Sequence, residues 1–207
     1  MNLFKKIKYK IRNQRDTLLW HINGRPVPPP HIVKQRILTN YAEVFNIKTF
    51  VETGTYYGDM LEALKYKFNL MYSIELSVKL YSLAKKRFKN DKFIKLINGD
   101  SATKLNQVLD KLSKKPTLFW LDGHYSAGVT AKGSKETPII EELQQIFENF
   151  NEEYVIIIDD ARCFGIDPSY PSIEYIIDYI KKEKPLLNIL VKNDLIRITP
   201  KKICPKL

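Results

Sequence analysis

Five short apolar segments alternate with amphipathic segments, and this alternation constrains the fold more than any other feature. The apolar segments are rich in β-branched and aromatic residues: TFVET near 49–53, NLMYSIE near 69–75, FIKLIN near 93–98, TLFWLD near 117–122 and YVIIID near 154–159. Helical periodicity separates them at 58–68, 77–90, 101–113 and 136–150. Strands that alternate with helices favour a doubly wound α/β sheet, because parallel strands need a crossover between them.

The C-terminal part adds one helix and two strands. A helix is predicted near 171–183, followed by the alternating runs NILVK and LIRIT. Asn193 and Asp194 form a short polar pair between the two runs, which is typical of a hairpin. The sequence therefore predicts an α/β fold with a doubly wound, Rossmann-like sheet of about seven strands. We expect it to be mostly parallel, with a C-terminal antiparallel hairpin and helices on both faces.

The segment RPVPPP at 25–30 divides the chain into two parts. Its four prolines prevent a helix and favour an extended backbone. Residues 1–30 are predicted to form a basic N-terminal helix and a proline-rich segment, and residues 31–207 a single α/β domain that begins with a helix at 31–45. A length of 207 residues suits one such domain.

Residues 2–22 have the pattern of an amphipathic helix. Apolar residues at helical intervals are surrounded by cations: the first group is Leu3, Phe4, Ile7, Ile11 and Leu18, and the second is Lys5, Lys6, Lys8, Lys10, Arg12 and Arg15. This pattern suits a helix that lies on an anionic membrane surface. The same stripe could pack on the α/β domain or on a second subunit in a homodimer. We expect packing to be the commoner outcome, because most amphipathic helices bury their stripe in protein.

Composition excludes several classes of protein. With 44% hydrophobic and 28% charged residues, the chain is neither collagen-like nor wholly disordered. No apolar run approaches the roughly 18 to 20 residues that cross a bilayer, and we expect no secretion signal. Cys163 and Cys204 are spaced as neither a metal-ligand pair nor a disulfide framework, so we expect a cytoplasmic protein, with peripheral membrane contact through the N-terminus as an option. The net charge of +11 favours anionic partners: nucleic acid, acidic lipid or an anionic substrate.

Every one of the five predicted strands ends at a carboxylate. These acids are Glu52, Glu75, Asp100, Asp122 and the pair Asp159-Asp160. In an open α/β sheet, ligands bind at the carboxyl ends of the strands, near the point where the strand order reverses. We therefore expect the functional site in a crevice at this edge.

The loop after the first strand and the acid after the second fit a nucleoside. Gly54 suits the tight turn from strand to helix and Gly58 a close packing of the helix start, whereas Tyr56 stands where a dinucleotide fingerprint has its middle glycine. A nucleoside without phosphates therefore fits better than a pyrophosphate. Glu75 lies 21 residues after Gly54, close to the spacing of an acid that binds both ribose hydroxyls. A solvated acid at a strand end is the alternative.

In this order, VETGTYYGDM, SIELS, GDS and LFWLDGHYS resemble the successive motifs of class I S-adenosylmethionine-dependent methyltransferases, over about residues 31–200. The resemblance implies that the cofactor is S-adenosylmethionine. It further implies that the first loop lines the methionine part of the cofactor, through Glu52, Gly54, Thr55, Tyr56 and Gly58. By the same resemblance Glu75 binds the ribose, Asp100 and Ser101 lie near the adenine, and Asp122 borders the cofactor. The first loop departs from the GxGxG of many members.

Asp122, Asp159 and Asp160 should converge, because they follow adjacent strands. Three such acids raise one another's pKa unless a cation neutralises them, and Mg²⁺ is the usual hard ion for oxygen ligands. The pattern resembles the metal-dependent, macrocin O-methyltransferase-like sugar O-methyltransferases, in which one Asp after the fourth strand and an Asp-Asp pair after the fifth hold the ion. Helix caps and loop turns are the alternative for tandem acids.

The loop after the fourth strand supplies the remaining candidates. His124 titrates near neutral pH and follows Asp122 by two residues, so we assign both as catalytic, with His124 as the base that deprotonates a hydroxyl. A loop hydrogen bond or metal ligation is the alternative for His124. Residues 126–138 are predicted to form a lid. Lys132, Lys135 and Arg162 are candidates to meet an anionic acceptor, His31 is a packing or substrate-entrance residue, and Cys163 is a small buried residue.

The resemblance implies methyl transfer from S-adenosylmethionine to a hydroxyl of a sugar, sugar nucleotide or glycan, assisted by Mg²⁺. Methylation of nucleic acid would suit the positive charge, but the chain has no NPPY-like motif after the fourth strand. A catalytically inactive α/β binding protein, docked through its basic N-terminus, is the alternative from another class.

Overall fold

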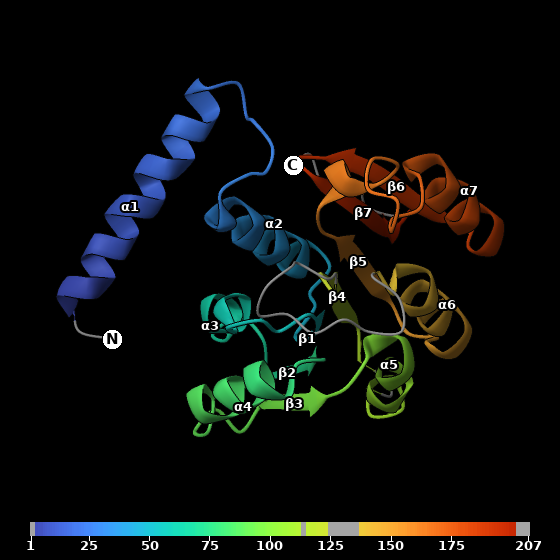
Figure 1. Cartoon of the computed structure of the whole chain (residues 1–207), viewed down its shortest axis with the longest axis horizontal. Coiled ribbons are helices and arrows are strands. Elements are labelled where there is room, and N and C mark those ends of the chain that lie inside the picture. Colours follow the sequence, from blue (N-terminus) through green and yellow to red (C-terminus); the bar gives the residue numbers. More distant parts are fainter. Residues whose placement is uncertain (1–2, 113–114, 124–136, 202–207) are drawn as a thin grey trace.

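A seven-stranded sheet lies at the centre of the molecule, in the strand order β3-β2-β1-β4-β5-β7-β6 (Figure 1). The computed structural model describes residues 3–112, 115–123 and 137–201. The parallel strands are β1 Thr49–Thr53, β2 Leu70–Glu75, β3 Ile94–Asn98, β4 Thr117–Leu121 and β5 Tyr154–Ile158. β6 Leu187–Lys192 and β7 Leu195–Pro200 form the C-terminal antiparallel hairpin, and β7 also pairs antiparallel with β5. The predicted fold class is confirmed.

Three helices cover each face of the sheet. One face carries α2 His31–Val44, α3 Asp59–Leu64 and α4 Val78–Arg87, and the other carries α5 Ser101–Leu109, α6 Ile139–Asn149 and α7 Ile173–Glu183, with a short 3₁₀ helix, Ala161–Cys163, after β5 (Figure 1). Alternate residues of β4 show the division: Leu118 and Trp120 pack with α2 and α3, whereas Phe119 and Leu121 pack with α5 and α6. Because both faces are buried, β1, β4 and β5 are buried at every position.

The helices are shorter than their periodicity predicts. α4 begins after Ser77, whose hydroxyl accepts a hydrogen bond from the Leu80 amide, and α6 begins after Pro138. α3 ends at Leu64, although the predicted helix extends to 68. Apolar periodicity continues into the turns that flank the helices, although these turns lack helical hydrogen bonds. Phe68, for example, is buried beyond the end of α3.

The strand order reverses between β1 and β4, which are neighbours that lead to helices on opposite faces. The two strand ends approach closely at Gly54, where φ is +82° and an added Cβ would lie 2.3 Å from the Asp122 carbonyl oxygen. Glycine is required here both by the left-handed backbone and by the approach of the second strand. The crevice at this switch point is where ligands bind in open α/β sheets.

The N-terminal helix, α1 Leu3–Ile22, projects from the body (Figure 1). It is anchored near its C-terminal end by Trp20, which is 5% exposed and donates a hydrogen bond from Nε1 to the Pro26 carbonyl at 2.8 Å. Ile11 and Leu18 are each 60% exposed, so the expectation that the apolar stripe packs on the α/β domain is wrong for these two residues. The side chains of Leu3, Phe4 and Ile7 lie outside the described set. Among the described residues, no helix combines the length and the apolar character that crossing a membrane requires.

Candidate active site

Glu75 joins the end of β2 to the loop after β1. Its carboxylate accepts two backbone hydrogen bonds, from the Tyr56 amide to Oε2 and from the Ser77 amide to Oε1, both at 2.8 Å. Burial raises the pKa of Glu75, and these amides oppose the rise. A carboxylate has about four lone-pair sites, so these backbone amides leave acceptor capacity for further donors. The acid is therefore fixed in position and can still accept hydrogen bonds from a ligand.

Glu52 lies beneath the same loop. The Ser73 hydroxyl donates to its carboxylate at 2.7 Å, and the Thr55 and Ser73 hydroxyl oxygens are 2.5 Å apart. Burial raises the pKa of Glu52 well above its ordinary value, because a buried site disfavours the charged form of a carboxyl. Through these contacts with Ser73, Glu52 and Thr55 hold the loop after β1 against β2.

The outer side of the loop presents two aromatic rings. Tyr56 has a left-handed backbone with φ of +51°, and its ring packs edge-on against Tyr57 at a centroid distance of 4.3 Å. Both rings are exposed. The loop ends at Gly58, where φ is +78° and an added Cβ would lie 2.6 Å from Cε2 of Phe88. Glycine at this position lets the start of α3 pack against α4, as the sequence predicted.

Asp100 and Ser101 follow β3 and begin α5. Asp100 is the N-cap residue, and its side chain accepts a hydrogen bond from the Ala102 amide at 3.0 Å. Ser101 is buried as the first residue of the helix. The structure thus places both residues at the crevice edge of the sheet, beside the end of β2.

Asp122, Asp159 and Asp160 come together at the ends of β4 and β5, and we call them the acid triad. One carboxylate oxygen from each lies within 4.8 Å of the others. Asp160 precedes the 3₁₀ helix with a left-handed backbone, φ of +55°, and its side chain makes no capping hydrogen bond. The alternative that this acid serves as a helix cap is therefore not what the structure shows.

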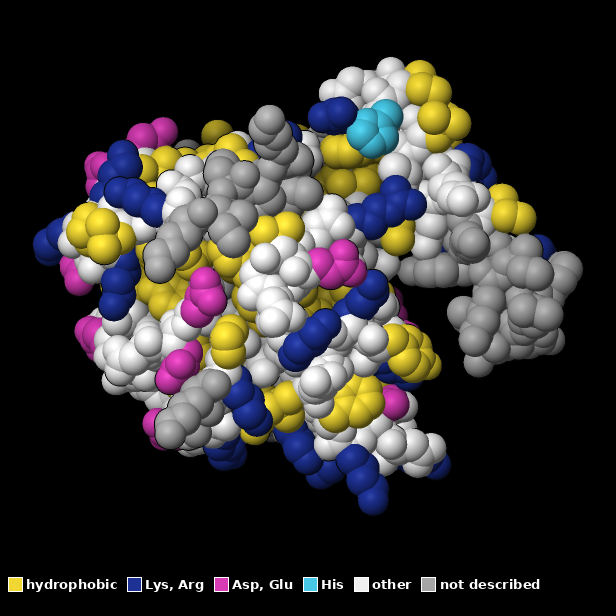
Figure 2. Space-filling model, turned by 180° about the vertical axis from the view of Figure 1, so that it is seen from behind, with side chains coloured by type: hydrophobic (Ala, Val, Ile, Leu, Met, Phe, Trp, Pro, Cys, Tyr) yellow, Lys and Arg dark blue, Asp and Glu magenta, His cyan; other side chains and the backbone are white. Residues whose placement is uncertain are grey.

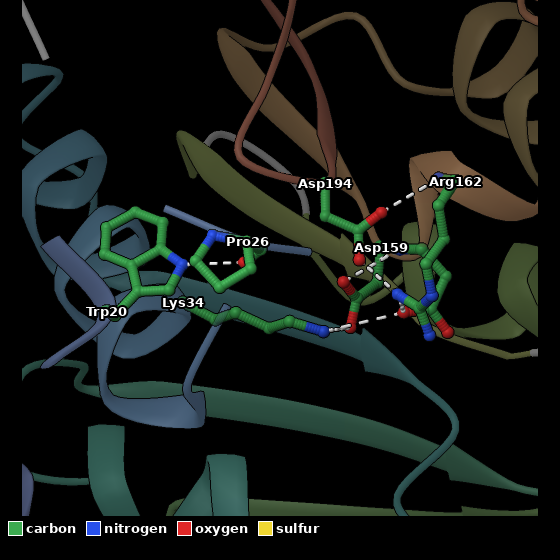
Figure 3. Close-up of polar contacts among 7 residues, drawn as sticks. Trp20, Pro26, Lys34, Asp159, Arg162 and Asp194 are labelled. Atoms are coloured by element: carbon green, nitrogen blue, oxygen red, sulfur yellow. Dashed lines mark hydrogen bonds and ion pairs between the residues drawn. The ribbon is translucent and has the colours of Figure 1, made fainter. Parts of the chain in front are cut away.

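Lys34 of α2 reaches the acid triad from the opposite end of the chain. Its Nζ lies 2.6 Å from Asp159 Oδ2 and 3.6 Å from Asp160 Oδ1, and all three side chains are buried (Figure 3). Burial alone would lower the pKa of Lys34, but Asp159 raises it above its ordinary value. The ammonium therefore stays charged beside the triad. The sequence analysis did not identify Lys34 as a residue of the site.

A second cation, Arg162 of the 3₁₀ helix after β5, joins the triad to the β6–β7 turn. Arg162 forms ion pairs with Asp160 at 2.7 Å and with Asp194, and its amide donates to Asp194 Oδ1 at 2.8 Å (Figure 3). Arg162 was a candidate to meet an anionic acceptor, but in the structure it connects the end of β5 to the hairpin. Asp194 has a left-handed backbone in the two-residue turn, as does Asn193.

Among the described residues, four carboxylates lie close to two cations around the triad: Asp122, Asp159, Asp160 and Asp194 with Lys34 and Arg162. Burial, together with the neighbouring Asp122, raises the pKa of Asp159 to about 7. Such a rise is expected when like charges share a buried site.

Glu142 of α6 is a buried acid that the sequence analysis missed. It is 1% exposed, and burial raises its pKa to about 7, although the Ser101 and Thr53 hydroxyls oppose the rise. An added Cβ on Gly123 would lie 3.2 Å from Glu142 Oε1, so this acid lies directly against the backbone after β4. A signal was present, because Glu142 lies three residues after Ile139 and four before Ile146, on the apolar face of its helix.

Lys34 carries the same signal. It precedes Ile37, Leu38 and Tyr41 by three, four and seven residues, and all of these are buried. A charge on the apolar face of an amphipathic helix is expensive unless it is paired. Reading the helix at 31–45 for such a charge would have predicted a buried partner, though not which acid it is.

A groove of about 850 Å³ runs between α1 and the helices α2 and α3. Polar and charged side chains dominate its lining, which consists of Arg12, Asn13, Asp16, Pro30, His31, Ile32, Asp59, Glu62, Ala63, Lys65, Tyr66 and Arg87. Burial lowers the pKa of His31, while Asp59 and Asp122 oppose the change, so His31 lies within electrostatic reach of the triad. The described structure places His31 in the lining of this groove, and its role stays a prediction.

The other candidates of the fourth loop lie mostly outside the described residues. These are His124, Lys132, Lys135 and the predicted lid, of which residues 137 and 138 alone are described. Cys163 is free and half-buried, so the expectation that it is a buried residue is wrong, and burial raises the pKa of its thiol.

The fold is shared with known methyltransferases. The O-methyltransferase TomG from Streptomyces achromogenes, solved in complex with SAM, superimposes with a TM-score of 0.59 at 14% identity, covering 90% of this chain and 87% of that chain. An O-methyltransferase from Bacillus cereus, solved in complex with SAH, gives a TM-score of 0.60 at 14% identity over 90% and 88%. The SAH-bound Podospora anserina methyltransferase PaMTH1 gives 0.58 at 15% identity over 98% and 97%.

No protein-family model and no curated protein sequence matches the chain. At these identities the structural similarity establishes the fold alone: the chain shares the fold of these SAM-bound and SAH-bound methyltransferases. Function has to be argued from the site.

Proposed function

We propose that this protein transfers a methyl group from S-adenosylmethionine to a hydroxyl of a sugar, sugar nucleotide or glycan, with assistance from Mg²⁺. The observation that carries the proposal is that the same edge of the sheet carries both a fixed acid at the end of β2 and a carboxylate cluster at the ends of β4 and β5. The first suits the cofactor, and the second suits the activation of a hydroxyl.

The residues at the ends of β1 and β2 fit S-adenosylmethionine. The backbone amides of Tyr56 and Ser77 hold both oxygens of Glu75, which leaves lone pairs for the two hydroxyls of a ribose. The loop from Gly54 to Gly58 provides a surface for the methionine part, and Asp100 and Ser101 lie beside the end of β2 for the adenine. When bound, the cofactor supplies an electrophilic methyl group.

The acid triad fits a hard divalent cation. Its three carboxylate oxygens lie within 4.8 Å of one another, and Asp159 and Asp160 are buried. Asp122, Asp159 and Asp160 would hold Mg²⁺ there, and the ion would lower the pKa of a substrate hydroxyl. Lys34 already neutralises part of the triad, so Lys34 and the ion compete for Asp159.

Deprotonation of the hydroxyl needs a base near the triad. His124 remains our prediction for this role, with Asp122 orienting the hydroxyl beside it. This proton transfer would make turnover depend on pH near neutrality, because an imidazole ordinarily titrates there.

The groove next to His31 suits a sugar-containing acceptor. A volume of about 850 Å³ is within the range of sites for small ligands. Sugar hydroxyls both donate and accept hydrogen bonds, and the groove offers acceptors on Asp59 and Glu62 and a donor on Arg87. Tyr66, which is largely exposed at the groove, offers a flat apolar surface to a sugar ring.

Three measurements test the proposal. Isothermal titration with S-adenosylmethionine should show binding, and transfer of a labelled methyl group to a panel of sugar nucleotides and glycans should identify the acceptor. Chelation with EDTA should abolish turnover, and Mg²⁺ should restore it. Absence of cofactor binding would overturn the whole proposal, whereas full turnover in excess chelator would overturn only the metal.

A further inference from the structure

The apolar stripe of α1 faces away from the rest of the molecule. With 100° between successive residues of a helix, Leu18 and Ile22 fall within about 20° of Ile11, and Trp20 falls on the opposite side. Exposure follows this geometry, since Ile11, Leu18 and Ile22 are 60%, 60% and 69% exposed while Trp20 is 5% exposed. Figure 2 shows hydrophobic side chains on the outer edge of this projecting helix. The helix is therefore anchored by one side and presents its apolar side to the surroundings.

The body-facing side of α1 is the polar one. Asn13, Asp16 and Thr17 are half-buried on the side of Trp20, and Thr17 accepts a hydrogen bond from Arg36 of α2 at 3.4 Å. Helices in globular proteins normally bury their apolar side and leave the polar side in water. The reversed orientation of α1 leaves an apolar surface for which the described residues supply no cover.

The charge of the helix identifies the partner. Residues 3–22 contain six Lys and Arg, all between positions 5 and 15, and a single acid, Asp16. A second copy of the chain would bring the same cations to the stripe and repel the first copy. An anionic lipid surface attracts them and accepts the apolar side chains in its outer layer.

We propose that α1 lies in the plane of an anionic membrane surface, with Ile11, Leu18 and Ile22 in the lipid and Trp20 connecting the helix to the α/β domain. The groove for the acceptor is formed partly by α1, through Arg12, Asn13 and Asp16. Membrane attachment would therefore place this groove on the side of α1 that faces away from the lipid. The attachment itself does not depend on the proposed methyl transfer.

Vesicle sedimentation of the full chain tests this inference. The parent protein should pellet with vesicles of phosphatidylcholine and phosphatidylserine at low salt, stay in solution with phosphatidylcholine alone, and dissociate as salt is raised. The combined variant Ile11→Ser, Leu18→Ser, Ile22→Ser should bind the anionic vesicles at least tenfold more weakly.

A matched control keeps the result specific. The variant Val78→Ser, Ile166→Ser, Leu186→Ser changes three apolar residues that are 67%, 82% and 73% exposed on the α/β domain, and it should bind as the parent does. Circular dichroism checks that both variants fold, which is expected because all six residues are exposed. A parent that stays in the supernatant, or a stripe variant that still pellets fully, would overturn the proposal. Loss of a dimer in sedimentation velocity without loss of vesicle binding would identify a second copy as the partner instead.

Discussion

The two halves of the crevice hold their acids by different means. At the ends of β2 and β3, backbone amides hold Glu75 and Asp100, with the Tyr56 and Ala102 amides as donors. At the ends of β4 and β5, the side-chain cations Lys34 and Arg162 hold the acids. Amides leave the negative charge of an acid in place, whereas cations cancel part of it.

This difference bears on what each half can bind. An acid held by amides accepts further hydrogen bonds from neutral hydroxyls, which suits a ribose. An acid held by a lysine binds a metal ion only as far as the ion displaces the ammonium or shares the carboxylate with it. The half held by amides thus keeps acceptor sites for a ligand. In the half held by cations, a metal ion would compete with the Lys34 ammonium for the carboxylate of Asp159.

The largest expected effect comes from Gly54, at the boundary between the two halves. Gly54→Ala would place a Cβ 2.3 Å from the Asp122 carbonyl, with φ of +82°. We expect a loss of about 3 kcal/mol or more in the free energy of unfolding, together with loss of cofactor binding. Urea denaturation and calorimetric titration measure the two effects.

The matched control for this variant is Gly24→Ala. Gly24 also has a positive φ, of +77°, but an added Cβ would meet no atom within 4 Å. In this control the free energy of unfolding should fall by about 1 kcal/mol, from backbone strain alone. Equal losses in the two variants would show that the close approach of β4 contributes nothing.

The next effect tests the half that is held by amides. Glu75→Ala should weaken S-adenosylmethionine binding by about 1 to 3 kcal/mol, because it removes charge-assisted hydrogen bonds to the ribose. Glu43→Ala removes an exposed glutamate, paired with Lys67, from another part of the chain and should not change the affinity. Unchanged calorimetric affinity in the Glu75 variant would remove the ribose assignment.

Glu142 lies between the two halves, and its removal should alter the pH dependence of stability. Because the pKa of Glu142 is raised to about 7 in the folded protein, its contribution to stability is fully present below the unfolded pKa and is lost as the pH rises through about 7. Glu142→Gln should therefore raise the free energy of unfolding by about 2 kcal/mol at pH 8 and leave it nearly unchanged at pH 4.

The measurement is the difference between variant and parent across pH, so that other titrating groups cancel. Glu174→Gln, at an exposed position in the first turn of α7, provides the matched control and should give a small difference at every pH. A Glu142 difference that does not vary with pH would mean that the acid is not held neutral.

The smallest effect tests the half that is held by cations. Lys34→Met should increase Mg²⁺ affinity about tenfold, because the ion no longer competes with an ammonium that is 2.6 Å from Asp159. Lys34→Arg, which keeps the charge, should retain the parent affinity. The readouts are calorimetry and the rise of Tm with added Mg²⁺, which also shows whether the Met variant folds. Equal affinity in all three proteins would show that Lys34 and the ion do not compete.

The strands were predictable to within one residue, and the reason is burial. The run from 154 to 158 is buried at every position, so its apolar residues mark the strand without ambiguity. The hairpin followed from its two-residue turn, Asn193 and Asp194, which both adopt the left-handed backbone. Helix ends were less predictable, because apolar periodicity continues into turns such as the one that contains Phe68.

The positions of the acids in the crevice followed from the rule on strand ends, but their partners did not. Lys34 and Asp159 are separated by 125 residues, and Arg162 and Asp194 by 32, so no local pattern connects them. Sequence periodicity indicates that a charge is buried, as for Lys34 and Glu142. It does not indicate which opposite charge or hydroxyl the fold will bring to it.

The separation of these pairs in the chain also sets the order in which the two halves can be completed during synthesis. Tyr56 and Glu75 are 19 residues apart, so the half held by amides can assemble soon after the first strands emerge from the ribosome. The acid pair after β5 has its full set of contacts only once Asp194 has been translated, near the end of the chain. In a nascent chain, the half held by amides can therefore be ordered before the half held by cations is completed.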